Sequence, residues 1–170
     1  MLGKMKDNKG ITLIALSITI VVIIIIASIS INYGKKSIEV SKLETLKTNM
    51  LLIKAKAKEY VEQADFKAGV NNEYKDGDNL KAEVASELKG TPDTESYSFV
   101  TLEEGQYLYN ITPELENIGL QNIKVDETKS EKYLVVYDLK NTKVEVYNTI
   151  GFNDNGTTKY SLSDLEKIDY

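Results

Sequence analysis

An uncharged apolar run occupies residues 11–31 of this 170-residue chain. No charged residue lies between Lys9 and Lys35, and isoleucine and valine dominate the run, as in the stretch Val21-Val22-Ile23-Ile24-Ile25-Ile26. As a helix the run would be roughly 31 Å long, about the thickness of the hydrocarbon core of a bilayer. Because lipid does not tolerate an unpaired strand edge, a single span has to be helical. The run therefore predicts a membrane-spanning helix.

The residues in front of the run make the prediction more specific. A short leader with three lysines ends at Gly10, and the apolar run begins directly after it; the matching residues are Gly10, Ile11, Thr12, Leu13, Ile14 and Leu16. This arrangement resembles the processing site of type IV prepilins and of the pseudopilins of type II secretion and competence systems. The resemblance implies that a prepilin peptidase cuts between Gly10 and Ile11 and N-methylates the new amine of Ile11. Gly10 suits a tight peptidase cleft because it has no Cβ.

The same resemblance implies a structural role for the apolar helix. Subunits of this family wait in the lipid bilayer and then enter a filament, with the help of an assembly platform membrane protein and of other pilin or pseudopilin subunits. The expected membrane and filament-core residues are Ile11, Thr12, Leu13, Ile14, Ala15, Leu16, Ile18, Val22 and Ile25. Most members carry Glu at the position of Ala15, whereas pseudopilins that start the filament at its tip lack it. Ala15 therefore predicts a minor subunit.

Two other interpretations of the apolar run stay open. The run could be an uncleaved single-pass anchor that tethers an extracellular binding module. It could also be a secretory signal peptide that is cut near residues 27–30, although its apolar stretch is longer than the usual 7–15 residues. The mature N-terminus distinguishes all three.

Composition excludes several classes of function. The chain has no Cys, His, Trp or Arg, and its net charge is -5. Disulfides, histidine-based nucleophilic triads and histidine metal sites are therefore excluded, and we expect neither an enzyme nor a cofactor. The leader carries three lysines against Asp7, so its removal would change the net charge to -7. An acidic domain is a poor partner for nucleic acid, and we expect none to bind.

The chain is expected to divide into four parts. Residues 1–10 are the cleaved leader, 11–33 the transmembrane half of a long helix, 34–65 its amphipathic half, and 66–170 an extracytoplasmic head. The family resemblance and the leader lysines place the N-terminus in the cytoplasm and the head outside, first as a single-pass membrane protein and then in a surface filament.

An apolar stripe follows the membrane run at helical spacing. Its members recur every three or four residues and lie on one face of a helix: Leu43, Leu46, Met50, Ile53, Ala57, Tyr60 and Ala64. The stripe predicts packing against a sheet. A coiled-coil seam has the same spacing, but its small alanines would make a weak zipper.

Beyond residue 96 the apolar period changes to two, which is typical of strands. We expect strands at 97–100, 107–111, 133–137 and 143–147, with 138–142 as a hairpin connection and 153–156 as a turn. Short helices are expected at 78–88 with Asp78 as N-cap and at 164–168 with Ser163 as N-cap. A helical turn is expected from Thr112 as N-cap, with Pro113 at the first helical position, to about Ile118. A long helix on an antiparallel sheet of three to five strands makes an α+β fold of the pilin type.

Several short patterns have simpler explanations than ligand binding. Asp76-Gly77-Asp78 and the turn 153–156 carry oxygen ligands, but neither matches an EF-hand loop, and turn chemistry accounts for both. Lys54, Lys56 and Lys58 alternate along a helix and so point in different directions. The sequons at Asn110 and Asn155 are patterns that chance produces often. The strand tyrosines, such as Tyr137, are expected in the sheet's packing.

Overall fold

A computed structural model of the protein describes residues 9–169. Residues 1–8 of the expected leader lie outside this range, as do the side chains of residues 9–15, 17 and 26–35 within the long helix. The chain divides into two compact units, residues 1–42 and residues 43–170, and we call the second unit the head. The boundary at Lys42 assigns most of the expected amphipathic half of the helix to the head.

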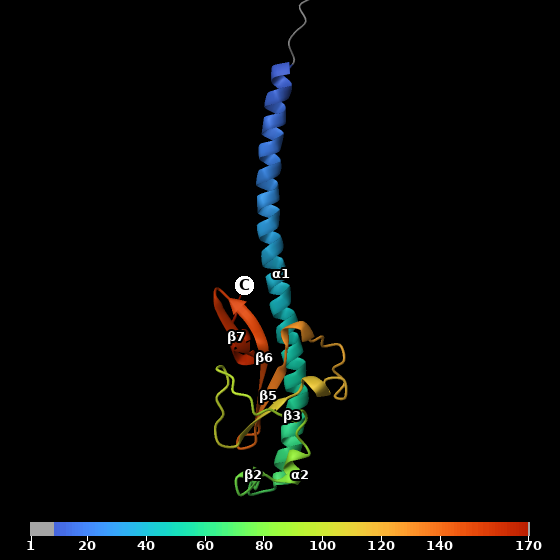
Figure 1. Ribbon diagram of the computed structural model, residues 1–170, viewed down its shortest axis with the longest axis vertical. Helices are drawn as coiled ribbons and strands as arrows, with labels where there is room; N and C mark the ends of the chain where they lie inside the picture. The colour runs from blue at the N-terminus through green and yellow to red at the C-terminus, as the bar shows by residue number, and fades with distance from the viewer. Residues whose placement is uncertain (1–8, 170) are drawn as a thin grey trace, which may run out of the picture. The chain divides into compact units, whose positions relative to one another are not determined.

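A single helix, α1, runs from Lys9 to Ala68 and enters the head at Leu43 (Figure 1). It ends where Gly69 adopts a left-handed conformation, with φ of 78°, and the amide of Gly69 donates to the carbonyl of Asp65. This is the usual way for glycine to close a helix. Across the side chains that the structure describes, no helix is both long enough and apolar enough to cross a bilayer.

The head is built on a five-stranded antiparallel sheet whose strands follow one another in chain order (Figure 1). The strands are β3 Thr91–Pro92, β4 Gln106–Asn110, β5 Tyr133–Asp138, β6 Lys143–Asp154 and β7 Thr157–Ser161. A small separate hairpin consists of β1 Lys75–Asp76 and β2 Asn79–Leu80. The short helices are α2 Ala82–Ala85 and α3 Leu162–Leu165, with 3-10 turns η1 Thr112–Glu114 and η2 Glu127–Lys129. The predicted α+β class is confirmed.

One face of the sheet packs on α1 and forms the main core. Alternate residues of β5 point into this core, and Tyr133 and Tyr137 are almost fully buried there. The opposite face of the same strands carries a second, smaller cluster of Leu108, Leu134 and Val136. Both faces of the central strand are therefore apolar, which explains why every residue of β5 is buried.

Residues 97–100 do not form the predicted strand. They lie across the second face of the sheet, where Tyr97, Phe99 and Val100 cover the smaller cluster. We call residues 93–100 the strap. Phe99 stacks on Tyr160 of β7 with ring centroids 4.1 Å apart. The alternating pattern was misleading because these side chains gain burial by covering the sheet rather than by pairing with a neighbouring strand.

The predicted short helices need correction at their starts. Asp78 is no N-cap, because Gly77 has a φ of 62° and turns the chain into the β1–β2 hairpin; α2 begins only after Lys81. Ser161, not Ser163, caps α3, since its hydroxyl accepts from the amide of Asp164 at 3.1 Å.

The helical turn expected at 112–118 is present as the 3-10 turn η1 and the turns that follow it. Two strands differ from the prediction. Thr91–Pro92 forms β3, for which no strand was predicted. Strand β6 continues past residue 147 to Asp154, and the turn at Asn155-Gly156 leads into β7, which was not predicted. Positive φ at both turn residues suits the Asn-Gly pair.

Candidate functional site

The described part of the apolar run is exposed on every side. Its large side chains are 45–59% exposed: Leu16, Ile18, Ile20, Val21, Val22, Ile23, Ile24 and Ile25. Six consecutive residues, 20–25, cover the whole circumference of a helix at 100° per residue. A helix that is apolar all round is normally one that is buried. The predicted members Leu16, Ile18, Val22 and Ile25 belong to this surface.

The predicted processing site falls at the start of α1. The helix includes the backbone from Lys9, so Gly10 and Ile11 have helical backbone conformation. The predicted filament-core residues 11–15, which include Ala15, have side chains that lie outside the described set.

The apolar stripe of the head lies in the main core. Leu43, Met50, Ile53, Ala57 and Ala64 are at most 1% exposed, while Leu46 and Tyr60 are partly buried against the same cluster. Val61 is also fully buried, although the predicted stripe did not include it. The stripe faces the sheet, so it is not available as a coiled-coil seam.

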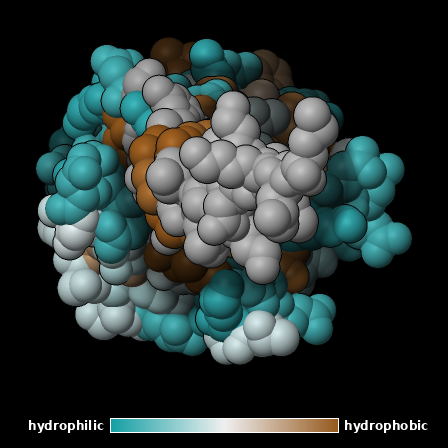
Figure 2. Space-filling view, turned by 90° about the horizontal axis from the view of Figure 1, so that it is seen from above, coloured by the Kyte–Doolittle hydropathy of each residue, from teal (hydrophilic) through white to brown (hydrophobic). Residues whose placement is uncertain are grey.

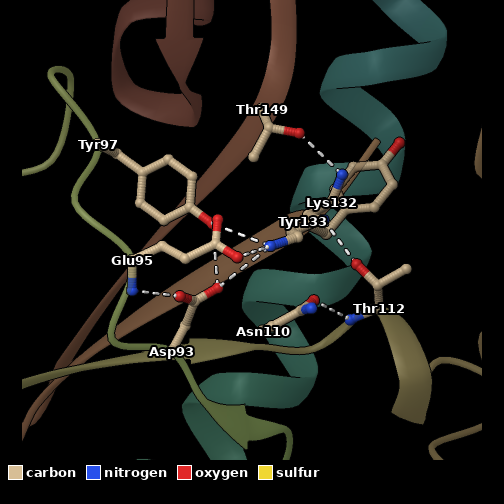
Figure 3. A network of polar contacts seen from close by, with 8 residues as sticks. All are labelled: Asp93, Glu95, Tyr97, Asn110, Thr112, Lys132, Tyr133 and Thr149. Atoms are coloured by element: carbon tan, nitrogen blue, oxygen red, sulfur yellow. Dashed lines mark hydrogen bonds and ion pairs between the residues drawn. The ribbon is translucent and has the colours of Figure 1, made fainter. Parts of the chain in front are cut away.

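A polar network fastens the strap to the sheet (Figure 3). The ammonium group of Lys132, just before β5, lies 2.7 Å from Glu95 Oε1 and 3.9 Å from Asp93 Oδ2. The Tyr97 hydroxyl donates to the same two carboxylates, at 2.9 Å to Glu95 and 3.1 Å to Asp93. Three strap side chains therefore point toward one lysine, as Figure 3 shows.

The network changes the acidity of its members. The hydrogen bond from Lys132, followed by that from Tyr97, holds the pKa of Glu95 below its ordinary value. The hydrogen bond to Glu95 correspondingly raises the pKa of Lys132. Burial, together with the hydrogen bond to Glu95, raises the pKa of the Tyr97 phenol to about 12. All three groups therefore keep their ordinary charge at neutral pH, and the network is a fastening rather than a proton-transfer site.

Backbone and threonine contacts position Lys132 within the network (Figure 3). The amide of Lys132 donates to Thr149 Oγ1 at 2.8 Å, and the amide of Tyr133 donates to Thr112 Oγ1 at 2.8 Å. Asn110 Oδ1 in turn accepts from the amide of Thr112. The two threonine hydroxyls accept from the main-chain amides of Lys132 and Tyr133, which fixes the backbone position of Lys132 at the start of β5.

The short patterns that were set aside as ligand sites do not form complete sites in the fold: Lys54 and Lys58 line one groove, whereas Lys56 lies outside it. Lys54 lies near Glu145, whereas Lys56 and Lys58 form ion pairs with Glu59 and Glu62 along the helix. Residue Asp154 ends β6, and Asp76 ends β1 in the separate hairpin. Within residues 9–169, no group of three or more Asp or Glu side chains is arranged to hold a metal ion.

Sequence reasoning missed the Lys132 network. Its partners lie 37 and 39 residues apart in the chain from Lys132, so no local spacing shows them. The only local signal is the Asp93-x-Glu95-x-Tyr97 alternation, which places three polar groups on one side of an extended segment. Comparison of the chain with protein-family models, with characterised proteins and with solved structures gave no match.

Proposed function

We propose that this protein is a minor pilin or pseudopilin, a structural subunit that is cleaved after Gly10 and polymerises through its N-terminal apolar helix. The observation that carries the proposal is the sequence Lys9-Gly10-Ile11-Thr12-Leu13-Ile14 in front of an uncharged run that extends to Gly34. A basic leader, a terminal glycine and a run of spanning length occur together at the spacing of the prepilin processing site.

The fold supports the proposal in two ways. A long helix packs on an antiparallel sheet, which is the arrangement that the family resemblance implies. The apolar side chains at 20–25 are 45–59% exposed, and a bundle of such helices from several subunits would cover them. The mechanism is therefore packing: the helices leave the bilayer and associate in a filament core.

The charge distribution suits the same mechanism. Residues 43–170 contain 24 Asp and Glu against 15 Lys, whereas residues 1–42 contain six Lys against two acidic residues. Hydrophilic residues lie around most of the periphery of the face shown in Figure 2. Acidic heads of this kind would remain in water on the outside of the filament while the uncharged segments associate.

Ala15 is the reason for proposing a minor subunit. A carboxylate at bilayer depth costs about 2.5–3.5 kcal/mol on insertion scales, so in this family it is useful only where a neighbouring amine meets it. A subunit with no neighbour above it has no such amine to meet. Ala15 fits a subunit near the tip or in the initiating complex, and the count of this chain relative to other subunits in sheared filaments tests that placement.

The experiment is mass spectrometry of the native protein. We expect a mature chain that begins at Ile11 with a methylated amine, and we expect Gly10→Val to retain the leader. An intact Met1 start would instead favour the membrane-anchored binding module, and a start near Ile31 would favour a secretory signal peptide. Either result would refute the pilin proposal.

A further inference from the structure

The turn between β6 and β7 holds the one asparagine of the sequence that glycine follows. Asn155 and Gly156 form this two-residue turn, and both have positive φ, of 49° and 88°. Both residues are exposed, and no atom lies within 4 Å of the place that a Cβ of Gly156 would take. An asparagine side chain therefore lies at the surface, beside a backbone amide that no side chain shields.

An asparagine in this position can react with the backbone that follows it. The nitrogen of Gly156 attacks Cγ of Asn155, the new C–N bond closes a five-membered succinimide ring, and the bond from Cγ to Nδ2 breaks. The proton of the Gly156 amide leaves with Nδ2, so the leaving group is ammonia. Water then opens the ring: opening at Cγ gives aspartate, and opening at the main-chain carbonyl gives isoaspartate. Glycine favours the first step because it has no Cβ beside the attacking nitrogen.

The folded turn restrains both reacting groups. The amide of Gly156 donates to Asn153 Oδ1 at 2.9 Å, so the attacking nitrogen is engaged and keeps its proton. Nδ2 of Asn155 donates to Asp154 Oδ1, also at 2.9 Å, which holds the side-chain amide in place. Both hydrogen bonds are exposed, so water competes for them and they open more readily than bonds in the core. The reaction therefore has to wait for these bonds to open.

Other asparagines of the head are better protected. Asn148 is 1% exposed, and its Oδ1 accepts from the amides of Ile150 and Gly151. Asn141 is exposed in a turn like Asn155, but the residue that follows it is Thr142, whose branched Cβ crowds the amide nitrogen. Asn141 is thus an internal control, because it shares the exposure of Asn155 but lacks the glycine.

We propose that Asn155 is a site of spontaneous deamidation and that the side chain of Asn153 slows the reaction in the folded head. Water is the only co-reactant. Either product adds one negative charge beside Asp154. Isoaspartate also adds one atom to the main chain of a two-residue turn, so the β6–β7 hairpin has to change its turn geometry. This modification goes beyond the filament role and does not depend on it.

The test incubates the purified full chain in nonionic detergent micelles at mildly alkaline pH. Digestion at acidic pH and mass spectrometry then measure aspartate and isoaspartate at residue 155. We expect slow conversion in the parent and conversion about two- to tenfold faster in Asn153→Ala, which loses one hydrogen bond to the attacking nitrogen. Asn153→Asp is the matched control, because it keeps an acceptor oxygen and should react no faster than the parent. Thermal melting establishes that each head is folded.

Concentrated urea separates the effect of the fold from the chemistry of the sequence. In urea the parent and Asn153→Ala should react at the same rate, and faster than the folded parent, because the turn is gone. Absence of conversion at Asn155, in the folded chain or in urea, would overturn the proposal. Equal rates of the folded parent and Asn153→Ala would also overturn it, as would an Asn153→Asp variant as fast as Asn153→Ala. Conversion of Asn141 at the rate of Asn155 would show that the glycine is not decisive and would overturn it too.

Discussion

The two units of this chain use the same helix in opposite ways. At residues 20–25 every side chain is a large aliphatic group and every one is 45–59% exposed. In the head, only every third or fourth residue of α1 is apolar and buried, as at Met50, Ile53 and Ala57, which are at most 1% exposed. The head closes its own core, whereas the side chains of residues 20–25 stay exposed in the part of the chain that the structure describes.

The difference separates the residues that stabilise the head from those that the described structure leaves exposed. A stripe one face wide is enough to bind the helix to a sheet, and the remaining faces can carry charge. An all-apolar circumference satisfies no single partner and is suited to lipid or to several helices at once. Substitutions in the head should therefore change folding, whereas substitutions in the apolar segment should change association and leave the head folded.

The largest effect is expected from Ile53→Asp. Ile53 is fully buried against the sheet, and an unpaired carboxylate there should cost about 4 kcal/mol or more and unfold the head. Leu52→Asp is the matched control on the adjacent residue, which is 46% exposed and should change stability by about 0.5 kcal/mol or less. Near-ultraviolet circular dichroism of the tyrosines in thermal melts measures both. Similar melting of the two variants would contradict the assignment of the core face.

Ile23→Lys should act on the other unit. Ile23 is 59% exposed within the apolar run, and a lysine near the centre of a membrane helix costs about 2.5–3.5 kcal/mol on insertion scales. We expect weaker retention in membranes by vesicle flotation, with the melting temperature of the head unchanged. Ile23→Leu is the control and should float like the parent. A loss of head stability in Ile23→Lys would show that the two units are not separable in this way.

Gly151→Ala tests how closely the backbones of β6 and β7 pack at Gly151. Gly151 has a φ of 67° within the irregular stretch of β6, and a Cβ there would lie 2.5 Å from the carbonyl oxygen of Lys159. We expect a loss of about 1–3 kcal/mol from strain and collision. Gly156→Ala has the same kind of backbone but no atom within 4 Å of its Cβ, so it should lose only about 1 kcal/mol. Chemical denaturation of both variants provides the comparison, and equal losses would show that space is not the deciding factor.

Local patterns predicted the parts of the fold that depend on one element at a time. The 3.6-residue period of Met50, Ile53 and Ala57 was enough to predict the helix face, and the β-branched and aromatic residues of Tyr133–Tyr137 were enough to predict the central strand. Val61 escaped because it lies beside Tyr60, and a strict 3-4 spacing selects only one of two neighbours. The proposed processing motif at Gly10 is likewise local, so the proposal could be made without knowing any tertiary contact.

Arrangements that depend on distant pairing could not be predicted. Tyr97 and Phe99 alternate like strand residues, and local sequence does not distinguish a segment that pairs with a sheet from one that covers it. The contact of Lys132 with Glu95 joins residues 37 positions apart in the chain and depends on how the folded head places the strap over the sheet. For the same reason Asp78 and Ser163 were wrong as caps: the competing hairpin and the competing Ser161 are decided by the folded neighbourhood.

The smallest effect is expected from the strap. It covers apolar residues of the sheet, but its polar contacts with Lys132 are partly exposed, so it is neither fully buried like the stripe nor exposed like residues 20–25. The pKa of Glu95 is lowered from 4.5 in the folded head by hydrogen bonds from Lys132 and Tyr97. Its contribution to stability is therefore fully present above pH 4.5 and is lost as the pH falls through the lowered value. Glu95→Gln should lower the melting temperature slightly at pH 6–8, and this difference from the parent should shrink below pH 4.5. Glu116→Gln, which makes none of these contacts, should show no such difference at any pH. A gap between the Glu95→Gln variant and the parent that persisted unchanged at pH 3 would mean that packing of the strap, rather than its charge, accounts for the effect.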